Sequence, residues 1–285
     1  MKFVTFQRPS ARPEAGVVVG GQVIGLAQAG FNGMLSVVAS GPEGRAKIEN
    51  FVHEPPADSV FPLSSVQLLA PVRRPPKMIC VGLNYRDHAA EARQEIPKVP
   101  TIFAKFSNVV IGPGASIVLP RNSRKPDYEA EFAFVIGKGG RHIPSYEWQQ
   151  HVFGYTAFND VSARDVQSAT SQWMMGKTFD TFAPMGPWLV SADEIADPHV
   201  LDINLRIGGE TLQHSNTREL IFKIPELVAY LSSVVTLEPG DVVATGTPAG
   251  VGFARTPPRY LQPGDEVIVS IEGIGELRNP VVAES

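Results

Sequence analysis

Short apolar runs separated by glycine and proline dominate the chain, and few stretches show the spacing of an amphipathic helix. Runs rich in β-branched and aromatic residues predict strands over residues 17–26, 77–81, 101–106, 132–136, 154–158 and 242–245. Helices are expected only over residues 43–52, 86–95, 145–151, 161–167 and 224–231. A hairpin is expected over 261–282, opened by a Pro-Gly-Asp turn. The pattern indicates a β-rich α+β fold.

A length of 285 residues allows a small domain followed by a larger one. Residues 1–70 resemble a small β-rich domain, since two apolar runs flank the turn Gly20-Gly21 and no chemical constellation is visible there. The segment 71–76 (Pro-Val-Arg-Arg-Pro-Pro) is typical of a linker. We therefore expect the second domain, with the chemistry, over residues 71–285.

The composition excludes several classes of protein. Hydrophobic residues make up 43% and charged residues 19%, with a formal net charge of -4, which is ordinary for a soluble globular protein. The chain has no basic block with interleaved aromatics, which argues against a nucleic-acid partner. No apolar run approaches the ~18 residues that a membrane span needs. The N-terminus has no signal-peptide core, and the single Cys80 cannot form an internal disulfide. We expect a cytoplasmic protein with no nucleic-acid or membrane partner.

Two glutamates introduce the apolar run at 132–136. Glu129 and Glu131 are two residues apart, so on a strand they lie on one face. Two neighbouring carboxylates that are shielded from water repel each other, and a hard divalent cation resolves the conflict. An edge strand with two solvated glutamates would show the same pattern. Asp160 lies where the strand at 154–158 meets the next helix, a place where functional groups are often exposed.

A second pair of titratable residues lies on the predicted helix at 86–95. His88 and Glu91 are three residues apart, so they share a helix face, and a carboxylate that orients an imidazole is typical of a general base. A solvated helix with an incidental pair is the alternative. The segment 86–98 has few apolar residues, which is typical of a lid that closes over a ligand.

Lys177 stands in a Gly-Lys-Thr sequence that superficially suggests a nucleotide site. The spacing of a phosphate-binding loop is absent, because residue 171 is serine where the first glycine should be. Lys177 can instead neutralise an anionic substrate or an enolate. Thr245 and Thr247 lie in a glycine-rich loop whose backbone N–H groups can hold a carboxylate.

Five motifs in order give the chain a family resemblance. They are Asn84-Tyr85 with His88 and Glu91, Tyr128-Glu129-Ala130-Glu131, Asn159 to Gln167, Gly176 to Asp180, and Thr245-Gly246-Thr247-Pro248. Over about residues 70–282 the chain resembles the fumarylacetoacetate hydrolase family. It is most similar to the two-domain subgroup that contains the fumarylacetoacetate hydrolase domain-containing 2 proteins.

The resemblance implies a mixed β-sandwich roll, often called a pseudo-β-barrel, that is usually a homodimer. It also implies a Mg²⁺ or Mn²⁺ site formed by Glu129, Glu131 and Asp160. The residues themselves agree, because three carboxylates without a nearby Cys/His cluster suit a hard cation and disfavour structural zinc.

The resemblance further implies a metal-dependent hydrolase that cleaves a C–C bond in a 2,4-dioxo acid and releases pyruvate through an enolate. His88, oriented by Glu91, would activate water, and Lys177 with the metal would stabilise the enolate. Substrate binding is expected from Arg164, Gln167, Asp180, Thr245 and Thr247.

The same enolate chemistry also serves an oxaloacetate tautomerase or decarboxylase, which is the alternative enzyme. A non-catalytic protein that binds 2-oxo acids is the third reading. The intact His88, Glu91 and Lys177 argue against it, since a binding protein needs no general base.

Overall fold

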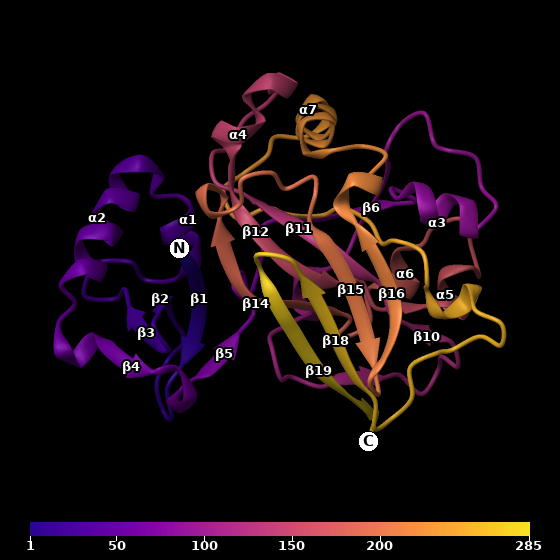
Figure 1. Ribbon diagram of the computed structural model, residues 1–285, viewed down its shortest axis with the longest axis horizontal. Coiled ribbons are helices and arrows are strands. Elements are labelled where there is room, and N and C mark those ends of the chain that lie inside the picture. Colours follow the sequence, from indigo (N-terminus) through magenta and orange to yellow (C-terminus); the bar gives the residue numbers. More distant parts are fainter.

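Two β-sheets pack face to face in the computed structural model, which describes residues 1–285 (Figure 1). Strands of the smaller sheet contact the middle of the larger one, and side chains from both sheets form one buried cluster. Neither sheet closes on itself, since each strand order ends in two free edges. The sheet-rich α+β fold predicted from the sequence is therefore confirmed, as an open sandwich roll without a closed barrel.

The larger sheet has 12 strands, of which ten form a continuous path. From one edge to the other these are β4 (Val60–Pro62), β3 (Gln22–Gly25), β2 (Glu14–Val19), β1 (Lys2–Gln7), β14 (Ala183–Ser191), β12 (Val152–Asn159), β11 (Ala130–Ile136), β17 (Val242–Ala244), β6 (Met78–Gly82) and β7 (Thr101–Ala104). Off this path, β5 (Gln67–Leu69) pairs with β1, and β8 (Val110–Ile111) pairs with β14.

The smaller sheet has five strands, in the order β16 (Glu210–Asn216), β15 (Asp202–Ile207), β18 (Glu266–Ile271), β19 (Gly275–Ala283) and β9 (Ile117–Leu119). Two short strands, β10 (Pro126–Asp127) and β13 (Ser162–Ala163), pair separately. The α-helices are α1 (Met34–Val38), α2 (Gly41–His53), α3 (Arg86–Glu91), α4 (Trp148–His151), α5 (Arg164–Gln167), α6 (Met174–Lys177) and α7 (Ile224–Val234). None of them is long and apolar enough to cross a membrane.

Strand β11 is buried on both faces because it lies between β12 and β17 in the larger sheet. Its side chains alternate between two clusters, as the two-residue period of a strand requires. Phe132 and Phe134 pack toward the smaller sheet, whereas Ala133 and Val135 pack into a second cluster on the opposite face. This double burial explains the near-continuous apolar run and fixes the register of the acidic residues at its start.

The N-terminal segment extends the larger sheet instead of forming a sheet of its own. Strand β1 pairs with β14, and this joins the first four strands to the rest, as the indigo part of Figure 1 shows. Phe3 and Leu26 share a buried cluster with Cys80 and Val135. Thr5 donates a hydrogen bond of 2.7 Å to the carbonyl of Pro71, at the start of the predicted linker. The boundary near residue 70 stays a prediction, but the two parts share packing.

Helix α3 is shorter than the sequence predicts, ending at Glu91 instead of residue 95. Arg93 adopts a left-handed backbone conformation, with φ of 52°. The N–H of Gln94 then donates to the carbonyl of Ala89, and that of Arg93 to Ala90, which is the Schellman arrangement that ends a helix. The predicted helix at 161–167 likewise starts later, at Arg164, because Ser162 and Ala163 pair with β10. Helices α2, α4 and α7 agree with the prediction to within a few residues, whereas the short helices α1 and α6 were not predicted.

We predict that residues 71–285 expressed without the N-terminal segment will be less stable than the whole chain. Removing β1 exposes the edge of β14 and the cluster around Cys80 and Val135, and such exposed edges and patches promote aggregation. Thermal unfolding and light scattering of both proteins measure the difference. A fragment with the full-length melting temperature and no aggregation would show that the second part folds independently.

Candidate active site

Three buried carboxylates meet where β11 and β12 come together. Antiparallel pairing sets Ala130 opposite Asn159, and the N–H of Asp160 donates to the carbonyl of Glu129 at 2.9 Å. This register places one oxygen each of Glu129, Glu131 and Asp160 within 4.8 Å of one another. These three residues are at most 5% exposed, so the edge strand with solvated glutamates is excluded. The predicted triad is therefore assembled by sheet pairing.

Two buried lysines compensate much of this negative charge. Lys177, at the end of α6, donates to Glu129 Oε2 at 2.8 Å and to Asp160 Oδ2 at 2.7 Å. Lys105 follows β7 and donates to Asp160 Oδ1 at 2.5 Å and to the carbonyl of Val161 at 3.0 Å. The sequence analysis missed Lys105. The signal that was present is one lysine inside an otherwise apolar strand, in the run 101–106.

Glu131 is the carboxylate of the triad that has no cationic partner. Its Oε2 accepts a hydrogen bond of 3.0 Å from the N–H of Gly246. Burial, together with the charges of Asp160 and Glu129, holds the pKa of Glu131 well above its ordinary value. Burial also acts to raise the pKa of Glu129, but Lys177 and Arg164 lower it, to about 2. The site thus has room for one more positive charge beside Glu131, either a proton or a metal ion.

The donor set fits a divalent metal. All three side chains offer oxygen, no cysteine or histidine joins the group, and the oxygens already lie close together. Hard cations such as Mg²⁺ and Mn²⁺ prefer oxygen ligands of this kind and retain waters that a substrate can replace. A buried acidic triad that can hold a metal is therefore a property of this chain.

Arg164 is the first residue of α5. Two nitrogens of its guanidinium group have partners and the third has none. Its Nε donates to Asp127 Oδ2 at 2.8 Å, and its Nη1 lies 2.6 Å from Glu129 Oε1 and 3.0 Å from Gln167 Oε1. The remaining nitrogen, Nη2, is buried and has no hydrogen-bond partner. The guanidinium also lies over the ring of Phe253, with a distance of 4.6 Å to the ring centre. An unpartnered donor that lines a cavity is suited to an oxygen of an anionic ligand.

Burial lowers the pKa of Arg164, but Glu129 and Asp127 outweigh this and raise it above its ordinary value, so the guanidinium stays charged. Asp127 was also missed by the sequence analysis, although it directly precedes the acidic strand. Its Oδ1 accepts from the N–H of Gly252 at 2.8 Å and its Oδ2 from that of Phe253 at 3.0 Å. Asp127 therefore ties the loop that carries Phe253 to Arg164.

His88 and Glu91 form the predicted pair on α3. His88 Nδ1 lies 3.2 Å from Glu91 Oε2, and Glu91 Oε1 accepts from the N–H of Gly250 at 2.9 Å. Asp87 fixes the start of the helix, since it accepts 2.7 Å and 2.5 Å hydrogen bonds from the His88 N–H and the Ser215 hydroxyl. With Nδ1 occupied by Glu91, Nε2 is the nitrogen of His88 that is available to a ligand. The geometry is that of an oriented general base.

A cavity of about 110 Å³ connects these groups. Its wall includes most of the predicted site residues, which are His88, Glu129, Glu131, Arg164, Gln167, Lys177 and Thr247. Asp160 lies behind this wall and is bound by both lysines. The rest of the wall consists of Val81, Gly82, Leu83, Ala92, Gln94, Phe103, Trp173 and Phe253. Groups from α3, α5, α6, β6, β7 and β11 therefore converge on one small space.

The structure does not bring two of the predicted substrate ligands to this wall. Thr245 is buried, and its hydroxyl donates to the carbonyl of Phe132 at 2.8 Å, so it joins the loop to β11. Asp180 is exposed, and its Oδ1 accepts from Asn108 Nδ2 at 3.0 Å. Thr247 reaches the wall, although its hydroxyl also donates to the carbonyl of Ala130 at 2.9 Å. The loop around Gly246 therefore supports the glutamates more directly than it faces the cavity.

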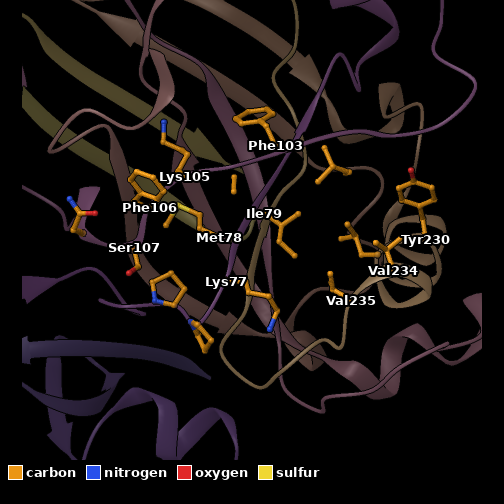
Figure 2. Close-up of a pocket in the computed structure, with 16 residues that line it drawn as sticks. Lys77, Met78, Ile79, Phe103, Lys105, Phe106, Ser107, Tyr230, Val234 and Val235 are labelled. Carbon is orange, nitrogen blue, oxygen red and sulfur yellow. The ribbon is translucent and has the colours of Figure 1, made fainter. Parts of the chain in front are cut away.

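A larger apolar groove of about 830 Å³ lies along β7 and α7. Figure 2 shows Ile79, Tyr230, Val234 and Val235 on one side of it and Phe106, Ser107 and Lys105 on the other. It contains no cluster of carboxylates, and Lys77 and Lys105 are its charged residues. Phe103 lines both spaces, so β7 separates the groove from the acidic cavity.

Comparison with known proteins agrees with the fold and identifies the family. The family model described as fumarylacetoacetate (FAA) hydrolase C-terminal matches residues 77–282. The chain belongs to the fumarylacetoacetate hydrolase family. It is 52% identical over 224 residues to the mitochondrial oxaloacetate tautomerase Fahd2a of Rattus norvegicus, covering 78% of this chain and 72% of the relative. The family includes hydrolases, isomerases and oxaloacetate tautomerases.

Two solved structures cover the whole chain. The fumarylacetoacetate hydrolase of Exiguobacterium antarcticum has a TM-score of 0.86 and 37% identity, with 100% of both chains covered. The maleylpyruvate hydrolase of Sphingobium sp. SYK-6, in complex with manganese(II) and pyruvate, has a TM-score of 0.85 and 31% identity, also with 100% of both chains covered. The resemblance drawn from the five motifs is confirmed.

We predict that metal binding displaces a proton from Glu131. Because its pKa is raised in the metal-free protein, Mn²⁺ must compete with that proton, and affinity should rise by up to about tenfold per pH unit. The rise ends once the pH exceeds the pKa of Glu131. Calorimetric titration in buffers of different ionisation heats counts the protons released.

Glu131→Gln and Glu129→Gln serve as a matched pair for this prediction. Both should weaken Mn²⁺ binding, but only Glu131→Gln should remove the pH dependence, since Glu129 is already ionised. A raised acid pKa also means that metal-free stability is lost as pH rises through that pKa, and Glu131→Gln should abolish this loss. Equal pH dependence in the wild type and Glu131→Gln would contradict the assignment.

Proposed function

We propose that this protein is an oxaloacetate tautomerase, which interconverts the enol and keto forms of a short 2-oxo dicarboxylic acid. The observation that carries the proposal is the small cavity, where an oriented base, two buried cations and the acidic triad surround a space of about 110 Å³. Pockets for larger ligands usually measure about 300–1,000 Å³. The 52% identity to a relative named oxaloacetate tautomerase supports the same reaction.

Binding of the acid uses groups whose hydrogen-bonding capacity is not filled by the protein. Arg164 Nη2 is buried, charged and unpartnered, so it can donate to a carboxylate oxygen of the substrate. Lys177 provides a second positive charge on the same wall. The chemistry that a cation bound by Glu129, Glu131 and Asp160 supplies is polarisation of the 2-oxo group and stabilisation of the enolate. We propose Mg²⁺ or Mn²⁺ as that cation.

The chain's own residues move the proton. His88, held by Glu91, takes a proton from C3 of the keto acid, and the electron pair of that C–H bond moves to give the enolate. Lys177 stabilises the negative oxygen through its charge. Transfer of the proton from His88 to that oxygen gives the enol and returns the histidine to its neutral form, and the reverse path restores the keto form, so only C–H, N–H and O–H bonds are formed and broken. Burial of the site keeps water away from the enolate.

Hydrolysis of a C–C bond in a 2,4-dioxo acid remains the second candidate. It was the first expectation from the sequence, and the His88–Glu91 pair could activate a water molecule as readily as it accepts a proton from carbon. The likeness to a maleylpyruvate hydrolase with bound pyruvate favours it. Decarboxylation would share the enolate. We place tautomerisation first because the more similar relative carries that name and the cavity is small.

We further propose that two copies of the chain associate through the groove beside β7. The outer edge of β7 pairs with no strand, and exposed apolar side chains on both walls include Phe106 at 48% and Val234 at 64%. Unpaired strand edges and contiguous apolar surface of this kind are normally covered by a partner. A cytoplasmic location also stays a proposal.

The reaction is tested by following the loss of enol absorbance of oxaloacetate with Mg²⁺ or Mn²⁺, alongside pyruvate release from acylpyruvates. Enol-to-keto conversion without pyruvate release supports the tautomerase, and pyruvate release alone supports the hydrolase. If the protein binds the acids with metal but neither reaction is accelerated, it is a binding protein.

For the base, we expect His88→Ala to lower kcat by about 10²- to 10⁴-fold, because proton transfer loses its acceptor. Metal affinity should remain nearly unchanged, since His88 is not among the carboxylate ligands. His53→Ala, at an exposed position on α2, is the matched control. Full activity, or a large loss of Mn²⁺ affinity, in His88→Ala would show that the histidine has another role.

For the assembly, we expect the wild type to be a dimer and Val234→Glu a monomer, because the new carboxylate would be buried against apolar surface. Light scattering after size-exclusion chromatography measures the mass. Val200→Glu, at another exposed valine away from the groove, should leave the dimer intact. A Val234→Glu protein with the wild-type mass would place the interface elsewhere.

A further inference from the structure

Trp173 is a prominent part of the cavity wall that the proposed proton transfer does not use. It immediately precedes α6, four residues before Lys177, and is half-buried. Its ring meets that of Phe103 edge to face, with centres 5.8 Å apart. The Phe103 ring in turn lies 5.1 Å from Lys177 Nζ. Phe103 therefore contacts both the tryptophan and the lysine that binds the carboxylates.

The indole ring of Trp173 packs against Gly82, in space that a side chain there would fill. A Cβ on Gly82 would lie 2.4 Å from Trp173 Cζ3 and 3.1 Å from Cη2, closer than side chains approach one another. The backbone of Gly82 is not in the left-handed region, so its conformation does not itself require glycine. The absence of a side chain at the end of β6 thus serves the packing of the indole ring against the backbone.

Helix α6, which begins directly after Trp173, is packed closely against α5. A Cβ on Gly176 would lie 2.3 Å from the backbone nitrogen of Gln167. This close approach packs α6 against α5, which carries Arg164. The ring therefore packs against the end of β6 and Phe103, and the helix that follows it is held against α5.

We propose that Trp173 limits substrate length, so that the site selects a four-carbon 2-oxo acid over acids with longer distal chains. The proposal rests on the proposed function, in which the reacting end of the acid lies between the glutamates, Lys177 and Arg164. With that end fixed, the distal end extends toward the aromatic side of a cavity of only about 110 Å³. Each additional methylene group must then displace the indole ring. Trp173 is in this sense a specificity-determining residue and takes no part in the proton transfer.

The test compares binding of pyruvate, 2-oxobutanoate and 2-oxohexanoate to the Mn²⁺-loaded protein by calorimetry, together with kcat/KM for oxaloacetate. In the wild type, we expect 2-oxohexanoate to bind at least about tenfold more weakly than 2-oxobutanoate. Trp173→Ala should shift this ratio by about 10- to 100-fold in favour of the longer acid, and Trp173→Phe should lie between. A purely structural role would weaken all three acids equally. Tyr146→Ala, which removes an aromatic ring that is 80% exposed, is the control.

Gly82→Ala adds a test that depends on the ring itself. In the wild-type background the new methyl group displaces the indole, and we expect binding of 2-oxobutanoate to change by about tenfold. In the Trp173→Ala background there is no ring to displace, so the same substitution should change affinity by less than about twofold. Thermal unfolding of each variant verifies that it is folded.

Two results would overturn the length limit. One is a ratio of the affinities for 2-oxohexanoate and 2-oxobutanoate that stays within about twofold of the wild-type ratio in both Trp173→Ala and Trp173→Phe. The other is an effect of Gly82→Ala that is the same with and without the indole. Failure of the proposed function is seen separately, because binding of these acids requires no turnover. If the ratio of the affinities for the longer and shorter acids shifts in the Trp173 variants but the protein does not tautomerise oxaloacetate, the length limit stands and the proposed reaction is wrong.

Discussion

The hydrogen bond from the N–H of Asp160 to the carbonyl of Glu129 sets the condition that the rest of the site must meet. It belongs to the β11–β12 pairing and brings three carboxylates together where they have little contact with bulk water. Isolated buried charge of this kind is very costly, so the fold has to supply compensation. The elements around the triad supply this compensation.

The compensation comes from three separate parts of the chain. Lys105 arrives from β7, Arg164 from α5 and Lys177 from α6, and each contacts at least one carboxylate of the triad or Asp127. Together they neutralise Asp127, Glu129 and Asp160 but leave Glu131 without a cation. The incomplete neutralisation leaves a place where a divalent ion can be held, and the unpaired Nη2 of Arg164 is a donor that can meet an anion. The proposed binding of metal and of acid would therefore depend on one arrangement of charges.

The sequence predicted the parts of this arrangement that depend on local spacing. Glu129 and Glu131 were found from the two-residue period of a strand, and His88 with Glu91 from the three-residue spacing on a helix. Lys105 was missed because its partner Asp160 is 55 residues away and no local pattern joins them. The role of Thr245 could not be read either, since a hydroxyl in a loop can point to a ligand or to a neighbouring carbonyl. The N-terminal segment was separated by composition, whereas its pairing with β14 depends on tertiary contacts.

Strand β7 makes the acidic site sensitive to its alignment with β6. Successive side chains of β7 alternate, with Phe103 and Lys105 turned inward and Ile102, Ala104 and Phe106 exposed. The pairing of Phe103 with Cys80 and of Ala104 with Ile79 sets this alternation. A slip of one residue would exchange the two faces, placing the charge of Lys105 on the surface and an apolar side chain against Asp160. The register of this edge strand therefore decides whether the buried carboxylate keeps its counter-charge.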